Sequence, residues 1–120
     1  MLDYVYWSFG TSYDTYENFV KAVDDYNKNM GESKWNAHQI VSSHKKVKVN
    51  FEAIWKDEDD FVEVTIQASD PAGIKMGEIL YKINQESLKI FEGADATFFE
   101  GLHEEGEEDG VPIYDMWTGS

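Results

Sequence analysis

The sequence predicts an α+β domain, built as an antiparallel sheet of five or six strands with two helices packed on one face. Two stretches alternate apolar and polar residues with a period of two, as half-buried strands do, and two others repeat apolar residues at helical spacing. The chain has 120 residues, and a domain of this length buries roughly 65% of the surface of its unfolded chain. We therefore expect a single α+β domain over residues 1–120.

The first 31 residues are expected to form a strand and a helix. Residues 2–9 are rich in Tyr, Val, Trp and Phe and precede Gly10, which favours a strand. Asp14 stands three residues before Glu17, the spacing of a capping box. The apolar residues that follow keep to one face, which predicts a helix over residues 15–30, ended by Gly31 in the left-handed conformation.

The central part of the chain, residues 34–69, predicts three strands joined by two turns. Apolar residues occupy every second position from 47 to 55, and the alternation resumes from 62 to 68 after the acidic turn KDEDD. In an antiparallel pair, Lys46 and Lys48 would lie near Gln67, Thr65 or Glu63, where each favourable pair contributes about 0.2–1 kcal/mol. The preceding segment WNAHQIV alternates less regularly and predicts the third strand.

The last part of the chain predicts a second helix and a hairpin. Asp70 and Pro71 are the residue types of an N-cap and a first helical position, so the helix is expected to begin there. Glu78 and Lys82 have the spacing of an exposed i,i+4 pair, and Gly73 and Gly77 indicate close packing of the helix on the sheet. The segment ESLKIFEGADA is compatible with a helix end or a short strand, and TFFEGL and PIYDMWTG flank an acidic loop as the arms of a hairpin.

The charge of the chain narrows the classes of partner. The net charge is −14, from 24 acidic and 10 basic residues, and every basic residue is a lysine. Arginine is the usual residue for bidentate binding of phosphate, and an acidic surface repels polyanions, so we expect no nucleic-acid partner. Residues 61–120 carry 13 acidic residues and 3 lysines. This concentration of negative charge favours association with a basic protein.

The expected cellular compartment is inferred from features that the sequence lacks. There is no cysteine, which excludes disulfides and thiolate chemistry and is typical of a reducing environment. The N-terminus has no basic region of the kind found in signal peptides, and no stretch reaches the about 18 apolar residues of a membrane span. We expect a cytoplasmic protein without membrane contact.

The run EEGEED, between two aromatic-rich arms, is the first candidate site. It lacks the register of an EF-hand loop, so two readings remain: a solvated turn with Gly106 and Gly110 in turn conformations, or a docking surface for a basic partner. The aromatic residues beside it could anchor such a partner, although about half of them are expected to face the core. The turn from Asp57 to Asp60 is a second possible contact. The expected partner-binding residues are Glu104, Glu105, Glu107, Glu108, Asp109, Phe99, Tyr114 and Trp117.

The residue patterns of known catalytic, metal and cofactor sites are missing from the sequence. His38, His44 and His103 do not have the i,i+4 spacing of a helical zinc site, and His103 is expected to be a surface cation beside Glu104 and Glu105. The chain has no GxSxG, P-loop or GxGxxG pattern. We expect no metal, no cofactor and no enzymatic activity. The alternative is a small ligand-binding or enzymatic domain with a pocket between the second helix and the sheet.

The closing block GADATFFEGLHEEGEEDGVPIYDMWTGS resembles the C-terminal pattern of a small uncharacterised bacterial family, in which FFEGL precedes an acidic loop and the chain ends in Gly-Ser. The segment GEILYKIN adds to this resemblance. In general character, a small, acidic, cysteine-free α+β protein is similar to the bacterial immunity proteins that neutralise polymorphic or contact-dependent toxins. This resemblance implies a non-enzymatic inhibitor of a basic toxin such as a nuclease. It implies no common fold and transfers no individual functional residue.

Overall fold

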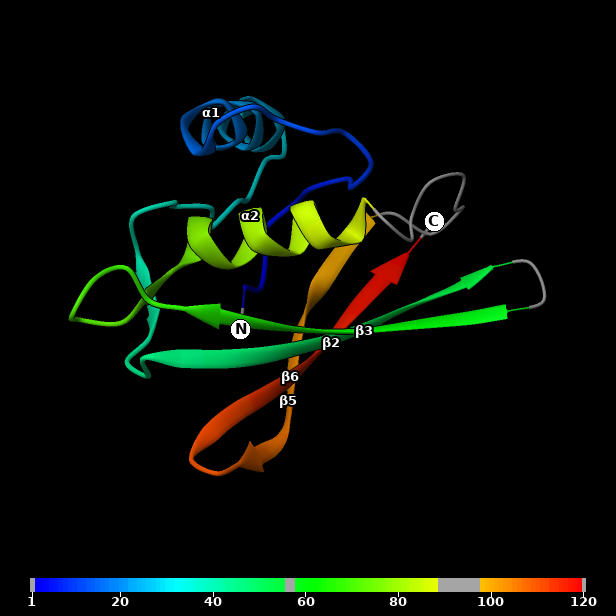
Figure 1. Ribbon diagram of the computed structural model, residues 1–120. Helices are drawn as coiled ribbons and strands as arrows, with labels where there is room; N and C mark the ends of the chain where they lie inside the picture. Colours follow the sequence, from blue (N-terminus) through cyan, green and yellow to red (C-terminus); the bar gives the residue numbers. More distant parts are fainter. Residues whose placement is uncertain (1, 56–57, 89–97, 120) are drawn as a thin grey trace.

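The protein folds into two layers of helix above a layer of sheet (Figure 1). The computed structural model describes residues 2–55, 58–88 and 98–119, with the backbone alone at residues 52–55 and 58–61. In chain order the elements are α1 (Tyr16–Lys28), β1 (Ile40–Ser42), β2 (Lys46–Trp55), β3 (Glu58–Gln67), β4 (Ile74–Lys75), α2 (Met76–Ser87), β5 (Phe98–Glu108) and β6 (Val111–Gly119). Helix α2 lies along the sheet, and α1 lies on the outer side of α2 (Figure 1).

The α+β class is confirmed, but the main sheet is mixed rather than purely antiparallel. Its strand order is β3-β2-β6-β5, and a separate two-stranded sheet joins β1 to β4. The β2–β3 and β5–β6 pairs are antiparallel hairpins, whereas β2 and β6 run parallel. The hairpins follow from local alternation and turn signals, but their docking against each other depends on contacts between distant parts of the chain. A local sequence pattern does not indicate whether two hairpins will meet through parallel or antiparallel strands.

The β2–β3 hairpin has the predicted register. Lys46 pairs with Gln67 and Lys48 with Thr65, and the Lys48 Nζ lies 3.7 Å from the Glu63 Oε1. The alternate side chains face α2 and form the centre of the core. They are Val47, Val49, Phe51, Val64 and Ile66.

The N-terminal segment, residues 2–9, does not form the predicted strand. It contributes an isolated bridge between Ser8 and Phe98, and the Phe99 N–H donates to the Trp7 carbonyl at 2.9 Å. The side chain of Asn27 on α1 replaces a strand partner: its amide nitrogen donates to the Tyr6 carbonyl at 2.8 Å, and its oxygen accepts from the Tyr6 N–H at 2.9 Å. The apolar residues of the segment are buried nonetheless, so the strand-like composition reflects burial rather than sheet pairing.

Both helices begin later than the sequence patterns predict. The N-cap of α1 is Thr15, whose hydroxyl accepts from the Asn18 N–H at 3.1 Å, so the predicted capping box from Asp14 is wrong by one residue. Asp70 is not the N-cap of α2. Its carboxylate accepts from the Ala72 N–H at 2.8 Å in a tight turn, and the chain then forms β4 before α2 begins at Met76. An Asp-Pro pair suits a turn as well as a helix start.

Gly77 allows α2 to approach the start of α1 and the segment before β1, whereas the sequence predicts close packing of this glycine on the sheet. A methyl group at this position would collide with the Tyr16 hydroxyl and would lie 3.1 Å from both the Cβ and the carbonyl oxygen of Ala37. The Gly77 N–H also donates to that carbonyl at 3.1 Å, so the backbones are already in contact.

We expect Gly77→Ala to destabilise the protein, although alanine favours a helix by about 1 kcal/mol over glycine. Overpacking costs typically about 1–3 kcal/mol, which exceeds that gain. Urea unfolding followed by circular dichroism measures the difference. The double variant Gly77→Ala with Tyr16→Phe is the control, because it removes the hydroxyl that the methyl group meets. A Gly77→Ala variant as stable as the wild type would contradict the tight packing.

Candidate functional site

The acidic run lies in a strand and not in a loop. Glu104, Glu105, Glu107 and Glu108 are part of β5, and the turn consists of Asp109 and Gly110, with φ angles of 53° and 80°. Two successive residues with positive φ suit a two-residue hairpin turn, for which Asp-Gly is a preferred pair. The expectation of an acidic loop was therefore wrong. Pairing with β6 holds these glutamates extended, although glutamate has a low strand propensity.

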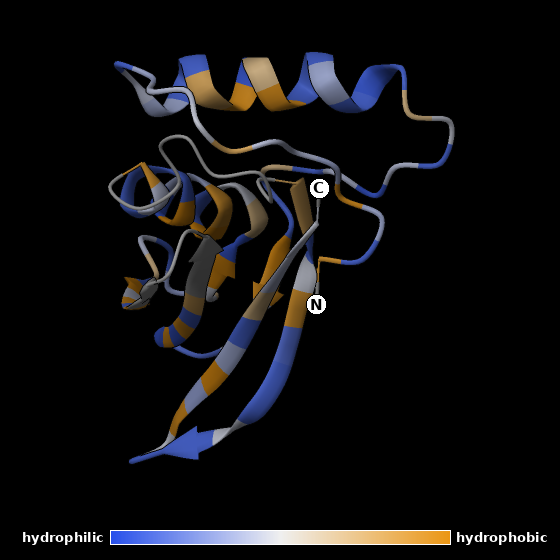
Figure 2. Ribbon diagram, turned by 90° about the vertical axis from the view of Figure 1, so that its right-hand side faces the viewer, coloured by the Kyte–Doolittle hydropathy of each residue, from blue (hydrophilic) through white to orange (hydrophobic). Residues whose placement is uncertain are grey.

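The turn end of the β5–β6 hairpin extends beyond the helices (Figure 1) and is strongly hydrophilic (Figure 2). Register shifts interrupt the ladder between Phe99 and Leu102 and between Glu104 and Gly106. A bulge of this kind inserts an extra residue, bends the strand and redirects a side chain. Glu105 is the inserted residue at the second shift, and its carboxyl group contacts that of Asp115 on β6.

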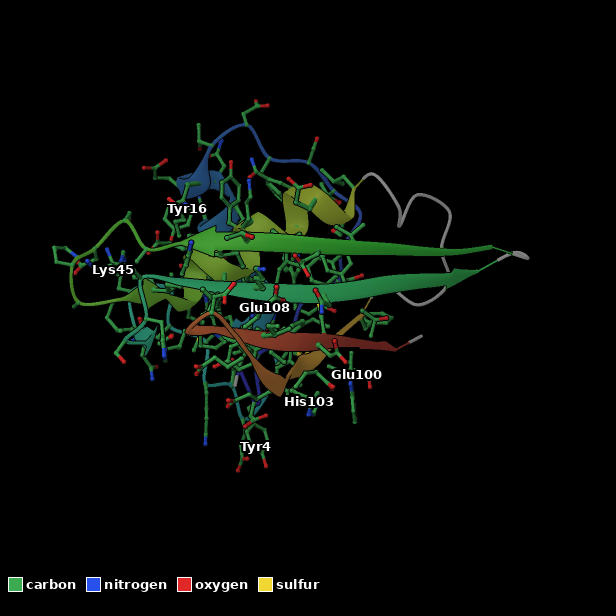
Figure 3. All side chains as sticks on the ribbon, turned by 60° about the horizontal axis from the view of Figure 1, so that its bottom comes forward. Tyr4, Tyr16, Lys45, Glu100, His103 and Glu108 are labelled. Carbon is green, nitrogen blue, oxygen red and sulfur yellow. The ribbon has the colours of Figure 1, made fainter. Side chains whose placement is uncertain are left out.

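A row of polar side chains crosses the face of the sheet that the helices leave open. Asp115 pairs with His103 on β5 and with Asn50 on β2, so the three residues stand side by side across three strands. Figure 3 is turned toward this face and labels His103. Trp117 follows two residues after Asp115, and its indole stacks on the His103 ring with 3.7 Å between centroids and 29° between planes. Trp117 remains 55% exposed, so its free surface faces solvent.

Two polar atoms of this row are buried without a hydrogen-bond partner among the described residues. They are the Asn50 Oδ1 and the His103 Nε2. A buried polar group without a hydrogen-bond partner lowers stability by about 1–3 kcal/mol. The row is therefore less stable than one in which every polar atom is hydrogen-bonded.

Negative charge dominates the electrostatics of the hairpin. The hydrogen bond and the repulsion from Asp115 raise the pKa of Glu105, desolvation adds to the rise, and His103 opposes it. On the other face, burial raises the pKa of Tyr114, with a further contribution from Glu104. A cation placed near Glu105 and Asp115 would relieve the repulsion between their carboxyl groups.

We expect Asp115→Asn to lower the pKa of Glu105 toward its ordinary value, because an amide carries no charge and can donate a hydrogen bond to the carboxylate. An NMR titration of the glutamate side-chain carboxyl carbons measures this pKa. Glu104→Gln is the matched control, since it should lower the pKa of Tyr114 and leave that of Glu105 unchanged. A Glu105 pKa that does not respond to Asp115→Asn would exclude the carboxyl contact.

The structure separates the predicted partner-binding residues into exposed and buried ones. Phe99 is only 5% exposed and packs edge-on against Phe9, so it belongs to the core and not to the surface. Tyr114 is half-buried and packs against the core, which leaves Trp117 as the exposed aromatic residue of the predicted set. The predicted acidic residues are all exposed. They are Glu104, Glu105, Glu107, Glu108 and Asp109.

The charges around the hairpin are partly compensated by one lysine. The Lys48 Nζ lies 3.9 Å from the Glu108 Oε2 as well as near Glu63, so it links β2 to both edges of the sheet. Exposed pairs of this kind contribute about 0–1 kcal/mol. The second predicted contact, from Asp57 to Asp60, belongs in part to β3, which begins at Glu58, while Asp57 and the side chains of the segment lie outside the described residues.

Sequence reasoning missed Asp115 and the stacking of His103 on Trp117. The signal was present in the Asp109-Gly110 turn, because counting back along both strands from a two-residue turn brings residues 103 and 115 close to each other. The bulge at Glu105 shifts that count by one, and no local pattern marks it. His103, expected at the surface beside Glu104 and Glu105, is only partly exposed because Trp117 covers its ring.

Within the described part of the chain, no group of three or more His, Asp or Glu residues is arranged to hold a metal ion. His44 contacts the Ser42 hydroxyl at 3.2 Å, and His38 lies apart on the surface. Neither α1 nor α2 has the length and apolarity that a membrane crossing requires.

Comparison of the chain with known proteins identifies no relative. No family model, no curated protein and no solved structure matches the chain.

Proposed function

We propose that the protein is a non-enzymatic acidic domain that binds one basic protein in the cytoplasm, as an immunity protein binds and neutralises a nuclease toxin. The observation that carries this proposal is the exposed Trp117, held in place by His103 in a hairpin that contains five acidic residues in its β5 strand and turn between residues 104 and 109. Interfaces concentrate their binding energy in aromatic anchors of this kind, surrounded by polar groups.

Electrostatic complementarity supports the choice of a basic partner. The active sites of nucleases are basic because they hold phosphate groups, and a ridge of carboxylates can occupy such a site in place of the nucleic acid. The exposed glutamates of β5 form such a ridge at the projecting end of the hairpin. The absence of cysteine from the chain suits a reducing cytoplasm.

Capture of the partner tests the proposal. Tagged protein is mixed with lysate of its own source cells at low and high salt, and bound proteins are read by mass spectrometry. One basic protein retained in stoichiometric amount and weakened by salt is the expected result. The capture is repeated with Trp117→Ala, since a partner retained equally by this variant would bind elsewhere on the protein.

We expect neutralisation of the hairpin by Glu104→Gln, Glu105→Gln, Glu107→Gln and Glu108→Gln to preserve folding and to slow association with the captured protein. Electrostatic steering raises association rates by about 10- to 1000-fold at low salt, so loss of these charges should lower the rate by about tenfold or more. Stopped-flow or surface-binding kinetics at several salt concentrations measures the rate.

A second quadruple variant with the same net charge is the control. It carries Asp14→Asn, Glu17→Gln, Asp25→Asn and Glu32→Gln, all of which lie on the exposed surface around α1. This variant should lose much less of the association rate than the hairpin variant. Equal losses in both would mean that net charge alone attracts the partner and that the hairpin is not the docking surface.

A further inference from the structure

A second site lies away from the hairpin, between α2 and the edge strand β3. A surface cavity of about 580 Å³ opens there, below the first residue of α1. This volume falls within the range of about 300–1,000 Å³ that small-molecule sites occupy. The residues that line it are Tyr16, Thr65, Ile66, Gln67, Ser69, Glu78, Tyr81 and Lys82.

Two aromatic rings form one wall of this cavity. The rings of Tyr16 and Tyr81 meet edge to face, with 5.5 Å between centroids and 68° between planes. The Tyr16 hydroxyl lies against Gly77, where it is buried and has no hydrogen-bond partner among the described residues. Burial, and then Glu78 and Glu17, raise the pKa of Tyr16, so its hydroxyl is protonated and neutral near neutral pH. The wall thus offers aromatic π faces to a ligand.

Two charged residues, Glu78 and Lys82, line the cavity, and its negative charge comes from Glu78. Its two carboxylate oxygens accept hydrogen bonds from the Ser69 N–H and the Lys75 N–H, each at 3.2 Å, which fixes the carboxylate in position. The predicted ion pair between Glu78 and Lys82 is not formed. Instead, the Lys82 Nζ lies 3.7 Å from the Glu86 Oε1, one turn further along α2, so Glu78 has no cationic partner among the described residues.

A fixed carboxylate beside aromatic faces is the arrangement that recognises organic cations. The net charge of −14 adds a field that concentrates cations near the surface. We propose that this cavity binds a small organic cation, an alkylammonium group carried on an apolar or aromatic body, with the ammonium at Glu78 and the body against Tyr16 and Tyr81. The inference is independent of the proposed docking function, because the cavity shares no residue with the hairpin.

Four probes with the same phenyl body separate the charge requirement from simple apolar burial. They are phenethylamine, phenethyl alcohol, phenylalanine and hydrocinnamate, which are cationic, neutral, zwitterionic and anionic at neutral pH. Each is titrated into isotope-labelled protein, with the backbone amides of Thr65, Gln67 and Ser69 as reporters in the cavity and the Trp117 indole as a reporter outside it.

Phenethylamine should shift the cavity reporters and bind at least about tenfold more tightly than phenethyl alcohol, as expected for a cation beside aromatic rings and a carboxylate. Hydrocinnamate should not bind. Equal affinity for the amine and the alcohol would reduce the site to an apolar hollow, and tighter binding of phenylalanine would assign the cavity to zwitterions; either result overturns the proposal. If phenethylamine shifted only the Trp117 indole signal, that result would also overturn the proposal.

Variants of the lining residues give a second, independent test. Glu78→Gln and Tyr81→Leu should each weaken phenethylamine about tenfold, whereas Lys82→Gln should leave its affinity unchanged or raise it. Because Glu78 also caps the start of α2, circular dichroism checks folding first, and Tyr81→Leu together with the probe series decides the outcome if Glu78→Gln is unstable. Trp117→Ala should bind the amine normally, which keeps this test separate from that of the docking surface. Unchanged amine affinity in a folded Tyr81→Leu variant would overturn the assignment.

Discussion

Replacing Trp7 by alanine is expected to cost about 3–5 kcal/mol, which is a large part of the about 5–15 kcal/mol that stabilises a typical domain. Trp7 is 4% exposed although it lies in a segment without regular secondary structure. Its ring lies 5.3–5.9 Å from those of Tyr13, Phe19 and Tyr26, and its indole N–H donates to the Asn84 Oδ1 at 3.1 Å. One side chain thus joins the N-terminal segment to both helices.

Urea unfolding followed by circular dichroism measures this free energy. Trp117→Ala is the matched control, because the same residue type is removed from an exposed position and only its stacking on His103 is lost, which should cost about 0.5–1.5 kcal/mol. Trp7→Phe keeps an aromatic ring but leaves Asn84 without its indole partner, and an intermediate loss is expected. A loss below about 1 kcal/mol for Trp7→Ala would show that the segment contributes little to the core.

On the surface, the largest expected effect is that of Trp117→Ala on partner binding. Truncation of an aromatic anchor typically costs about 2 kcal/mol or more, which corresponds to roughly 30-fold in affinity. Loss of the indole also uncovers the His103 ring on which it stacks. The docking surface therefore changes in shape and also loses apolar area. Calorimetry with the captured basic protein measures the dissociation constant, and the dissociation rate should account for most of the change.

Phe98→Ala is the control for this experiment. Phe98 is also an exposed aromatic residue of the same hairpin, at 45%, and pairs with Gly119 near Trp117, but it is the Trp117 ring that stacks on His103 in the polar row. Its removal should change the affinity by much less than that of Trp117. If both variants lose affinity equally, the partner contacts apolar surface along the whole hairpin, and the anchor role of Trp117 is wrong.

The elements that could be predicted from the sequence are those whose information is local. The β2–β3 hairpin follows from a period of two sustained on both strands, and its register agrees residue by residue with that pattern. Helix α1 follows from its apolar stripe, within two residues at its C-terminal end. The exposed glutamates of the candidate site could likewise be named from the sequence, because a run of charged residues remains in contact with water in almost any fold.

Predictions failed where tertiary contacts replace local preference. Residues 2–9 have the composition of a strand, yet Asn27 satisfies the backbone of Tyr6 and no strand partner is needed. The acidic residues of β5 have the composition of a loop, yet the ladder with β6 keeps them extended. The contact of Glu105 with Asp115 depends on a bulge, and the parallel pairing of β2 with β6 depends on the whole fold. Neither feature can be predicted from a stretch of a few consecutive residues.

The parallel pairing of β2 with β6 also has a consequence for folding during synthesis. The β2–β3 hairpin can form as soon as residue 67 is available, whereas β6, its neighbour in the sheet, follows β2 by more than fifty residues. Until the ribosome has made β6, the inner edge of β2 has no partner and exposes unpaired backbone groups, which invite association with other chains. Closing the sheet is a late, long-range event, and such steps are slow. Ribosome-bound chains that stop before residue 111 should therefore aggregate or recruit chaperones more readily than chains that include β6.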